Sequence, residues 1–94
     1  MSTIYKYPLN LADANCGPKR QPLEDLRVEQ ILHVGIDPTG VPCVWVKVFP
    51  CKGLQDRLTL DIVGTGHEVG NACNIHIGSF THGRFVWHVF STLV

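Results

Sequence analysis

The segment CVWVKVF, residues 43–49, alternates two kinds of side chain and thereby decides the fold class. Its three valines, Val44, Val46 and Val48, occupy every second position. Because successive side chains of a β-strand point to opposite faces, this spacing predicts a strand with one buried, valine-lined face. Trp45 falls on the opposite face.

The same period of two recurs on both sides of this segment. Further strands are predicted at residues 3–9, 28–37, 57–63, 73–80 and 84–90. Together they make about six strands joined by short turns. We therefore expect an all-β fold, a single small antiparallel sandwich or half-open barrel with little or no helix.

The predicted strand at 57–63 carries the alternation of the opening segment further along the chain. Leu58, Leu60 and Ile62 are expected to face the core, and Asp61 is expected to face outward.

Two other segments are predicted to connect strands. Residues 10–26 are rich in Asn, Asp, Gly and Pro, which favours a long surface loop. Pro22 and the LEDL that follows it can start one helical turn there. Residues 50–56, PCKGLQD, predict a second turn.

Length and charge limit the classes of function. Ninety-four residues fit one domain, residues 1–94, because a second core would be too small to be stable. Eight basic residues balance eight acidic ones, and Lys19-Arg20 is the only basic pair. Duplex nucleic acid is usually bound by a basic face, so we expect no duplex nucleic-acid partner.

The location and redox state also follow from composition. The first ten residues lack a charged leader followed by an apolar run, and no apolar run approaches the ~20 residues of a membrane helix. The spacing of Cys16, Cys43, Cys51 and Cys73 fits neither paired zinc ligands nor a dense disulfide scaffold. We expect reduced cysteines, a cytoplasmic protein, no membrane partner and no cofactor.

The stretch DIVGTGHEVGNAC, residues 61–73, resembles a nucleotide-binding loop only in its glycines. A phosphate loop needs a following lysine and a helix, and neither is indicated after residue 70. We interpret the stretch as a turn in which Gly64, Gly66 and Gly70 adopt positive φ angles. Alternatively, its backbone N–H groups form an anion-binding concavity, with Thr65 and His67 as side-chain donors.

The histidines of the last hairpin can meet only in one strand register. A two-residue loop at His82-Gly83 places His76 and His88 on opposite faces. A three-residue loop, residues 81–83, pairs His76 with His88 beside Arg84, and this register is preferred because it gives a coherent apolar face. The pair is a candidate ligand-binding surface or simply two solvated histidines. No metal site is assigned, because zinc needs further ligands.

No catalytic residue is assigned from the sequence. A nucleophile needs a base within hydrogen-bond reach, and no such pair is fixed by spacing. Asp61 and Glu68 flank the glycine turn, but we interpret them as ordinary exposed polar residues.

Aromatic residues are the candidate interface. In the preferred register Phe80 and Phe90 fall on the outer face of the hairpin, and Trp45 lies opposite the valine face. If no second layer covers them, they form an apolar patch that marks an interface and favours a homo-oligomer. The alternative is that some of them are buried in the core.

Four motifs together resemble a known family. IYKYPL, VPCVWVKV, DIVGTGHEV and GRFVWHVF are similar to those of a family of short uncharacterised bacteriophage and prophage proteins, over residues 4–90. The segment CKG, residues 51–53, departs from that pattern as an insertion. The resemblance implies provenance, and it carries no activity or site residue over to this chain.

These observations lead to one functional hypothesis and its alternatives. We expect a phage-encoded accessory binding protein that inhibits a host factor, for example an anti-phage defence factor, by binding a host protein or sequestering a nucleotide signal. The expected ligand-binding residues are Thr65, His67, Arg84, His76 and His88. A small metal-dependent or nucleotide-cleaving enzyme that uses the same histidines is an alternative, as is a minor virion or assembly component.

Overall fold

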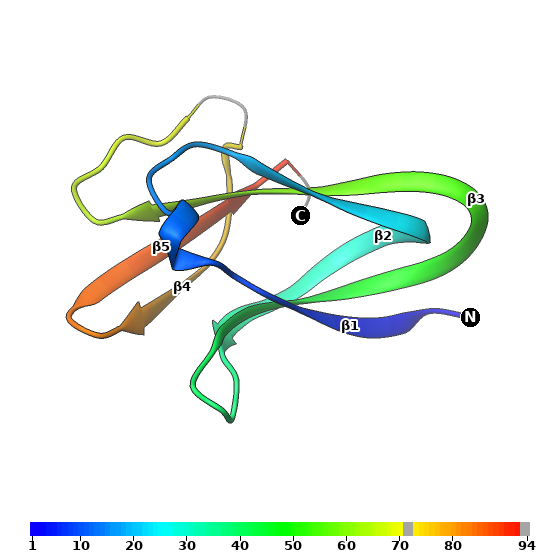
Figure 1. The fold of residues 1–94 in the computed structure, drawn as a ribbon, viewed down its shortest axis with the longest axis horizontal. Helices are drawn as coiled ribbons and strands as arrows, with labels where there is room; N and C mark the ends of the chain where they lie inside the picture. The colour runs from blue at the N-terminus through cyan, green and yellow to red at the C-terminus, as the bar shows by residue number, and fades with distance from the viewer. Residues whose placement is uncertain (71–72, 93–94) are drawn as a thin grey trace.

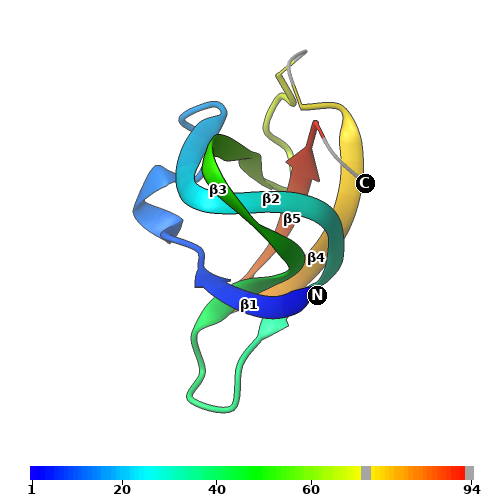
Figure 2. The ribbon, with the colours of Figure 1, turned by 90° about the vertical axis from the view of Figure 1, so that its right-hand side faces the viewer.

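The computed structural model describes residues 1–70 and 73–92 of the chain. In order, the elements are β1 (Thr3–Pro8), the 3-10 helix η1 (Leu11–Asp13), β2 (Lys19–Ile36), β3 (Pro42–Gly64), β4 (Ile75–His82) and β5 (Phe85–Ser91). The five strands form one antiparallel sheet that curls into a half-open barrel (Figures 1 and 2). The predicted all-β fold is confirmed, and no α-helix occurs in the described ranges.

The strand β3 is the centre of the sheet. Its first half pairs with β1 on one side, and β2 pairs with it along most of its length on the other. Its last five residues, from Leu60 to Gly64, pair with β5, and β4 pairs with the far edge of β5. One continuous strand therefore holds both halves of the fold together.

The two strands predicted at 43–49 and 57–63 are parts of this one strand, and the turn predicted at 50–56 is a bend within it. At the bend the register of β2 against β3 shifts between Glu24 and Leu26. Asp25 adopts a positive φ of 56°, and its Oδ1 accepts a hydrogen bond from the N–H of Gly53 at 2.8 Å. Asp25 and residues 51–54 have no register partner at this bend, where the ribbon of β2 and β3 folds back on itself (Figure 1).

The loop predicted at 10–26 is too long. Residues 19–26 belong to β2, and Pro22, which was expected to start a helical turn, pairs instead with Arg57 of β3. Leu23 alone among residues 19–26 is fully buried, at 4% exposure. Most of this part of β2 is held by ladder hydrogen bonds rather than by an apolar face, so alternation in the sequence does not reveal it.

The core forms on the face that the alternation predicts. Val44, Val46 and Val48 are completely buried, and Leu58 is 2% exposed. Asp61 contradicts the pattern, because it was expected to face solvent and is 2% exposed. Its Oδ1 has no hydrogen-bond partner among the described residues. None of the helices in residues 1–70 and 73–92 has the length and apolar character required to cross a bilayer.

The closing hairpin uses neither register considered from the sequence. His82 pairs with Phe85, so the two-residue loop is Gly83-Arg84. Gly83 has a φ of 63°, as the first central residue of a type II′ turn requires. This register places Ser79, and not His76, directly across from His88. The preferred three-residue loop is therefore wrong.

Candidate functional site

A cleft of about 500 Å³ lies between the glycine segment and the closing hairpin. Its lining combines the end of β3 and the segment after it with the β4–β5 turn and the start of β5. The lining residues are Asn15, Gly64, Thr65, His67, Arg84, Phe85, Val86 and Trp87. Three of the five predicted ligand-binding residues, Thr65, His67 and Arg84, therefore line one surface.

The glycine segment folds as a turn that rests on β5. The N–H of His67 donates to the carbonyl of Gly64 at 3.1 Å, and the N–H of Thr65 donates to the carbonyl of Val86 at 3.3 Å. Only Gly66 of the three glycines adopts a positive φ, at 94°. Gly64 has a different constraint, since a Cβ there would lie 3.1 Å from the ring of Trp87, which is closer than most Cβ contacts. The predicted turn is present, but Gly64 and Gly70 do not adopt the positive φ angles that were predicted for them.

Asn15 fixes the end of β3 from outside the sheet. Its side-chain oxygen accepts a hydrogen bond from the N–H of Gly64 at 2.8 Å, and its own N–H donates to the carbonyl of Ile62 at 2.8 Å. The segment after η1 thereby forms part of the cleft wall. Asn15 falls within the predicted 10–26 loop and is not among the predicted site residues.

The cleft combines cationic and aromatic side chains. Arg84 and His67 are exposed, so both can meet a ligand from solution. Phe85 is 63% exposed, and its ring centroid lies 5.8 Å from that of Trp87. Trp87 is half-buried, and its indole N–H has no hydrogen-bond partner among the described residues. Neither ring is among the predicted ligand-binding residues.

The remaining two predicted residues reach the cleft through a chain of hydrogen bonds. His76 Nε2 lies 2.9 Å from Ser79 Oγ, and Ser79 Oγ lies 2.8 Å from His88 Nδ1. His88 Nε2 lies 2.9 Å from Thr65 Oγ1, which belongs to the cleft wall. The two imidazole centroids are 6.2 Å apart. All five predicted residues therefore lie on one connected surface, and Ser79, which was not predicted, links His76 to His88.

No metal centre is formed by this cluster. Throughout residues 1–70 and 73–92, no three His, Cys, Asp or Glu side chains are grouped closely enough to hold a metal ion. His33 lies elsewhere and packs against Trp45, with the two rings tilted and their centroids 5.2 Å apart.

The three predicted interface residues have different environments. Phe80 is 6% exposed and belongs to the core, so its predicted outward placement is wrong. Phe90 is half-buried with its ring edge-on to His76, and Trp45 is also half-buried. In this register Phe85 is more exposed than the other large apolar side chains of the hairpin, with Val86 next.

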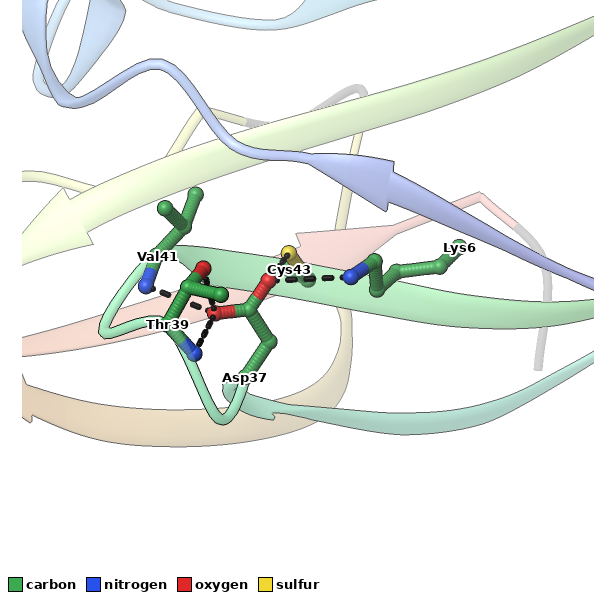
Figure 3. Close-up of polar contacts among 5 residues, drawn as sticks. All are labelled: Lys6, Asp37, Thr39, Val41 and Cys43. Atoms are coloured by element: carbon green, nitrogen blue, oxygen red, sulfur yellow. Dashed lines mark hydrogen bonds and ion pairs between the residues drawn. The ribbon is translucent and has the colours of Figure 1, made fainter.

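The carboxylate of Asp37 has the most perturbed environment in the described chain, and its partners are all internal (Figure 3). Its Oδ1 accepts hydrogen bonds from the hydroxyl and N–H of Thr39 and from the N–H of Val41, at 2.7 to 2.9 Å. These bonds and that from Lys6 hold the pKa of Asp37 well below its usual range. Asp37 therefore shapes the β2–β3 turn and does not belong to the cleft.

A second, smaller cavity of about 280 Å³ lies over the C-terminal half of β3 and was not anticipated from the sequence. Leu58, Leu60 and Ile62 contribute to its lining, as do Lys19 and Arg20. The basic pair Lys19-Arg20 therefore lines this cavity and not the cleft at Thr65.

The sequence profile of a domain of unknown function, DUF7352, matches residues 1–93, and the chain belongs to this family. No curated protein and no solved structure matches the chain.

Proposed function

We propose that this member of the DUF7352 family is an accessory binding protein whose cleft beside Thr65 holds a small nucleotide. The observation that carries the proposal is the meeting of Arg84 and His67 with the rings of Phe85 and Trp87 in one cleft. Guanidinium groups bind phosphate through paired hydrogen bonds, and exposed aromatic rings stack on nucleobases. A ligand with both an anionic group and a flat ring satisfies both halves of the lining.

The size and charge of the surroundings support a small ligand over a polymer. A volume of about 500 Å³ falls within the ~300–1,000 Å³ usual for small-molecule sites. A duplex partner would require an excess of basic residues, and the chain carries none. A single nucleotide needs only the local charge of Arg84 and His67.

The resemblance to bacteriophage and prophage proteins supports a role for this binding. A phage protein that sequesters a nucleotide signal in the host cytoplasm would silence the host factor that responds to it. Direct binding of a host protein is the other form of this proposal. Phe85, exposed at the tip of the hairpin, is the residue that would make such a contact, and it would also favour a homo-oligomer.

The proposal is tested by native mass spectrometry of the purified protein after incubation with a nucleotide extract of host cells. The wild type is expected to retain one ligand per chain. Arg84→Ala is expected to weaken binding about tenfold or more, because a hydrogen bond to a charged group contributes about 1.5–3 kcal/mol. The matched control is Arg27→Ala, which removes an exposed arginine of β2 outside the cleft lining.

Two results would contradict the nucleotide proposal. Equal retention by Arg84→Ala and Arg27→Ala would place the ligand outside the cleft. A wild-type protein that captures a host protein but no small molecule would favour the second form of the proposal.

A further inference from the structure

We propose that Thr65, His88, Ser79 and His76 form a proton relay that catalyses hydrolysis of a phosphoester held in the cleft. This inference rests on the proposed function, because it requires an anionic ligand beside Thr65. It adds to binding a reaction that destroys the ligand.

The relay has the spacing that hydroxyl and imidazole groups need for proton transfer. Three successive contacts, Thr65 Oγ1 to His88 Nε2, His88 Nδ1 to Ser79 Oγ and Ser79 Oγ to His76 Nε2, measure 2.9, 2.8 and 2.9 Å. A base within hydrogen-bond reach of a hydroxyl, and itself oriented by a third group, is the arrangement that activates hydroxyls and water in enzymes. Here both nitrogens of His88 are engaged, so its ring orientation is fixed from both sides.

Both ends of the relay are exposed, one in the cleft wall and the other on β4. Thr65 is exposed in the wall of the cleft, together with Arg84 and His67. His76, at the other end, is exposed on β4, where it can exchange protons with solvent. His88, between them, is half-buried. A proton can therefore enter at the ligand and leave at a separate point on the surface.

The hydrogen bonds can run in either direction without movement of heavy atoms. Before the reaction, the Thr65 hydroxyl donates to His88 Nε2, the Nδ1–H of His88 donates to Ser79, and the Ser79 hydroxyl donates to His76 Nε2. When all three hydrogen bonds are reversed, His76 donates toward Ser79 and His88 donates toward Thr65. Thr65 then turns its own hydroxyl to the carbonyl oxygen of Val86, which lies 3.4 Å away. The structure therefore provides a partner for Thr65 in both states.

The proposed step converts the first state into the second. A water oxygen forms a bond to phosphorus while the ester P–O bond breaks, and the departing oxygen takes a proton from solvent. The water gives a proton to Thr65 Oγ1 as Thr65 passes its own to His88 Nε2. The Nδ1 proton of His88 moves to Ser79, and that of Ser79 moves to His76 Nε2. His76 then releases its Nδ1 proton to solvent, so one water is consumed and no other reactant is needed.

Arg84 completes the site. A phosphoryl group under attack carries negative charge on its non-bridging oxygens, and a guanidinium group in the same cleft stabilises that charge. Arg84 thus acts in binding and in the reaction, whereas Ser79 and His76 act only through His88 and are positioning residues.

The test uses bis(4-nitrophenyl) phosphate, which combines a phosphodiester with aromatic rings and releases coloured 4-nitrophenol. His88→Ala and Ser79→Ala are expected to lower kcat by about 100-fold or more and to leave KM unchanged, because general-base catalysis contributes roughly 10²–10⁴-fold. Thr65→Ser, which keeps the hydroxyl, should stay close to the wild type. Thr65→Val should lose activity as His88→Ala does.

His82→Ala is the matched control, because His82 is an exposed histidine of the same hairpin that takes no part in the relay. Its kcat is expected to equal that of the wild type. Thermal unfolding of every variant shows whether it is folded, and the exposed Thr65 pair tests the relay even if Ser79→Ala does not fold.

Three results would overturn the relay alone. Binding of the diester without turnover by the wild type would refute catalysis and leave the proposed function standing. Equal losses in His82→Ala and His88→Ala would remove the specific role of His88. A covalent phosphoryl group on Thr65 would make Thr65 the nucleophile in place of water. Failure of the wild type to bind or cleave any nucleotide or diester would instead overturn the proposed function as well.

Discussion

The ammonium nitrogen of Lys6 lies 2.9 Å from Oδ2 of Asp37, so a single ion pair joins β1 to the turn between β2 and β3 (Figure 3). The Lys6 side chain is 46% exposed, whereas that of Asp37 is 5% exposed. The same carboxylate also organises the turn through Thr39 and Val41. Asp37 therefore links β1, which pairs with one side of β3, to the turn that joins β3 to β2 on its other side.

This arrangement predicts a loss of stability in acid. The pKa of Asp37 is lowered in the fold by the Thr39 hydroxyl, the Val41 N–H and Lys6, in that order. The unfolded state therefore binds the proton first, and the stabilising contribution is present above about pH 4 and is lost as the pH falls further. Asp37→Asn should lower Tm at pH 6 and flatten the fall of Tm between pH 6 and pH 3. Glu24→Gln, at an exposed position, should keep the wild-type slope.

Gly78 should not tolerate a side chain. A Cβ at this position would lie 2.7 Å from the Cβ of Val34, so β4 would have to move away from β2. Gly78→Ala is expected to reduce the free energy of unfolding by about 1–3 kcal/mol, as measured by urea denaturation. Gly70→Ala is the control, since its nearest contact would be an ordinary 3.5 Å. Equal stability of the two variants would show that β2 and β4 are less closely packed than described.

The bend of the β2–β3 ribbon depends on the side-chain oxygen of Asp25. Asp25→Asn keeps an acceptor for the N–H of Gly53 and tolerates the positive φ, so its free energy of unfolding should change by less than about 0.5 kcal/mol. Asp25→Ala loses both advantages and should cost about 1–2 kcal/mol. Urea denaturation of the two variants distinguishes these values. A loss in Asp25→Asn as large as that in Asp25→Ala would assign the effect to the charge.

The four thiols should react at different rates. Cys16 is exposed and Cys51 is half-buried, whereas Cys43 and Cys73 are 1% and 0% exposed. Burial also raises the pKa of the Cys43 and Cys73 thiols, which lowers the fraction of reactive thiolate. A disulfide reagent should therefore label Cys16 first and Cys51 second, and the other two only on unfolding. Cys16→Ser should remove the fast phase, and early labelling of Cys73 would contradict its buried placement.

The sequence predicts the strands of this fold better than their boundaries. The valines from Val44 to Val48 and the leucines at 58 and 60 alternate strongly enough to give the type of element and its buried face. The bend at 50–56 contains Pro, Gly and Asp, which are the same residues that a loop uses. It belongs to the sheet because Pro50, Gln55 and Asp56 pair with β2, and the Asp25–Gly53 hydrogen bond at the bend joins residues 28 positions apart.

The contacts of the candidate site, like the strand boundaries, could be predicted from the sequence only in part. Gly83 suits the last position of a three-residue loop and the first central position of a type II′ turn, so local chemistry does not choose between them. The choice decides whether His88 faces His76 or Ser79. The five predicted residues were brought onto one surface in spite of the wrong register, because a bulge between His76 and Gly78 restores contact through Ser79.

The central position of β3 has a consequence for how the protein is made. Its partners are synthesised long before it, at residues 3–8, and well after it, at residues 85–91. A nascent chain that ends at residue 70 can pair β1 and β2 with β3, but it leaves the last residues of β3 without their β5 neighbour. The sheet can therefore be completed only once β5 has been synthesised, and contacts of such large sequence separation place its folding on a time scale of milliseconds to seconds.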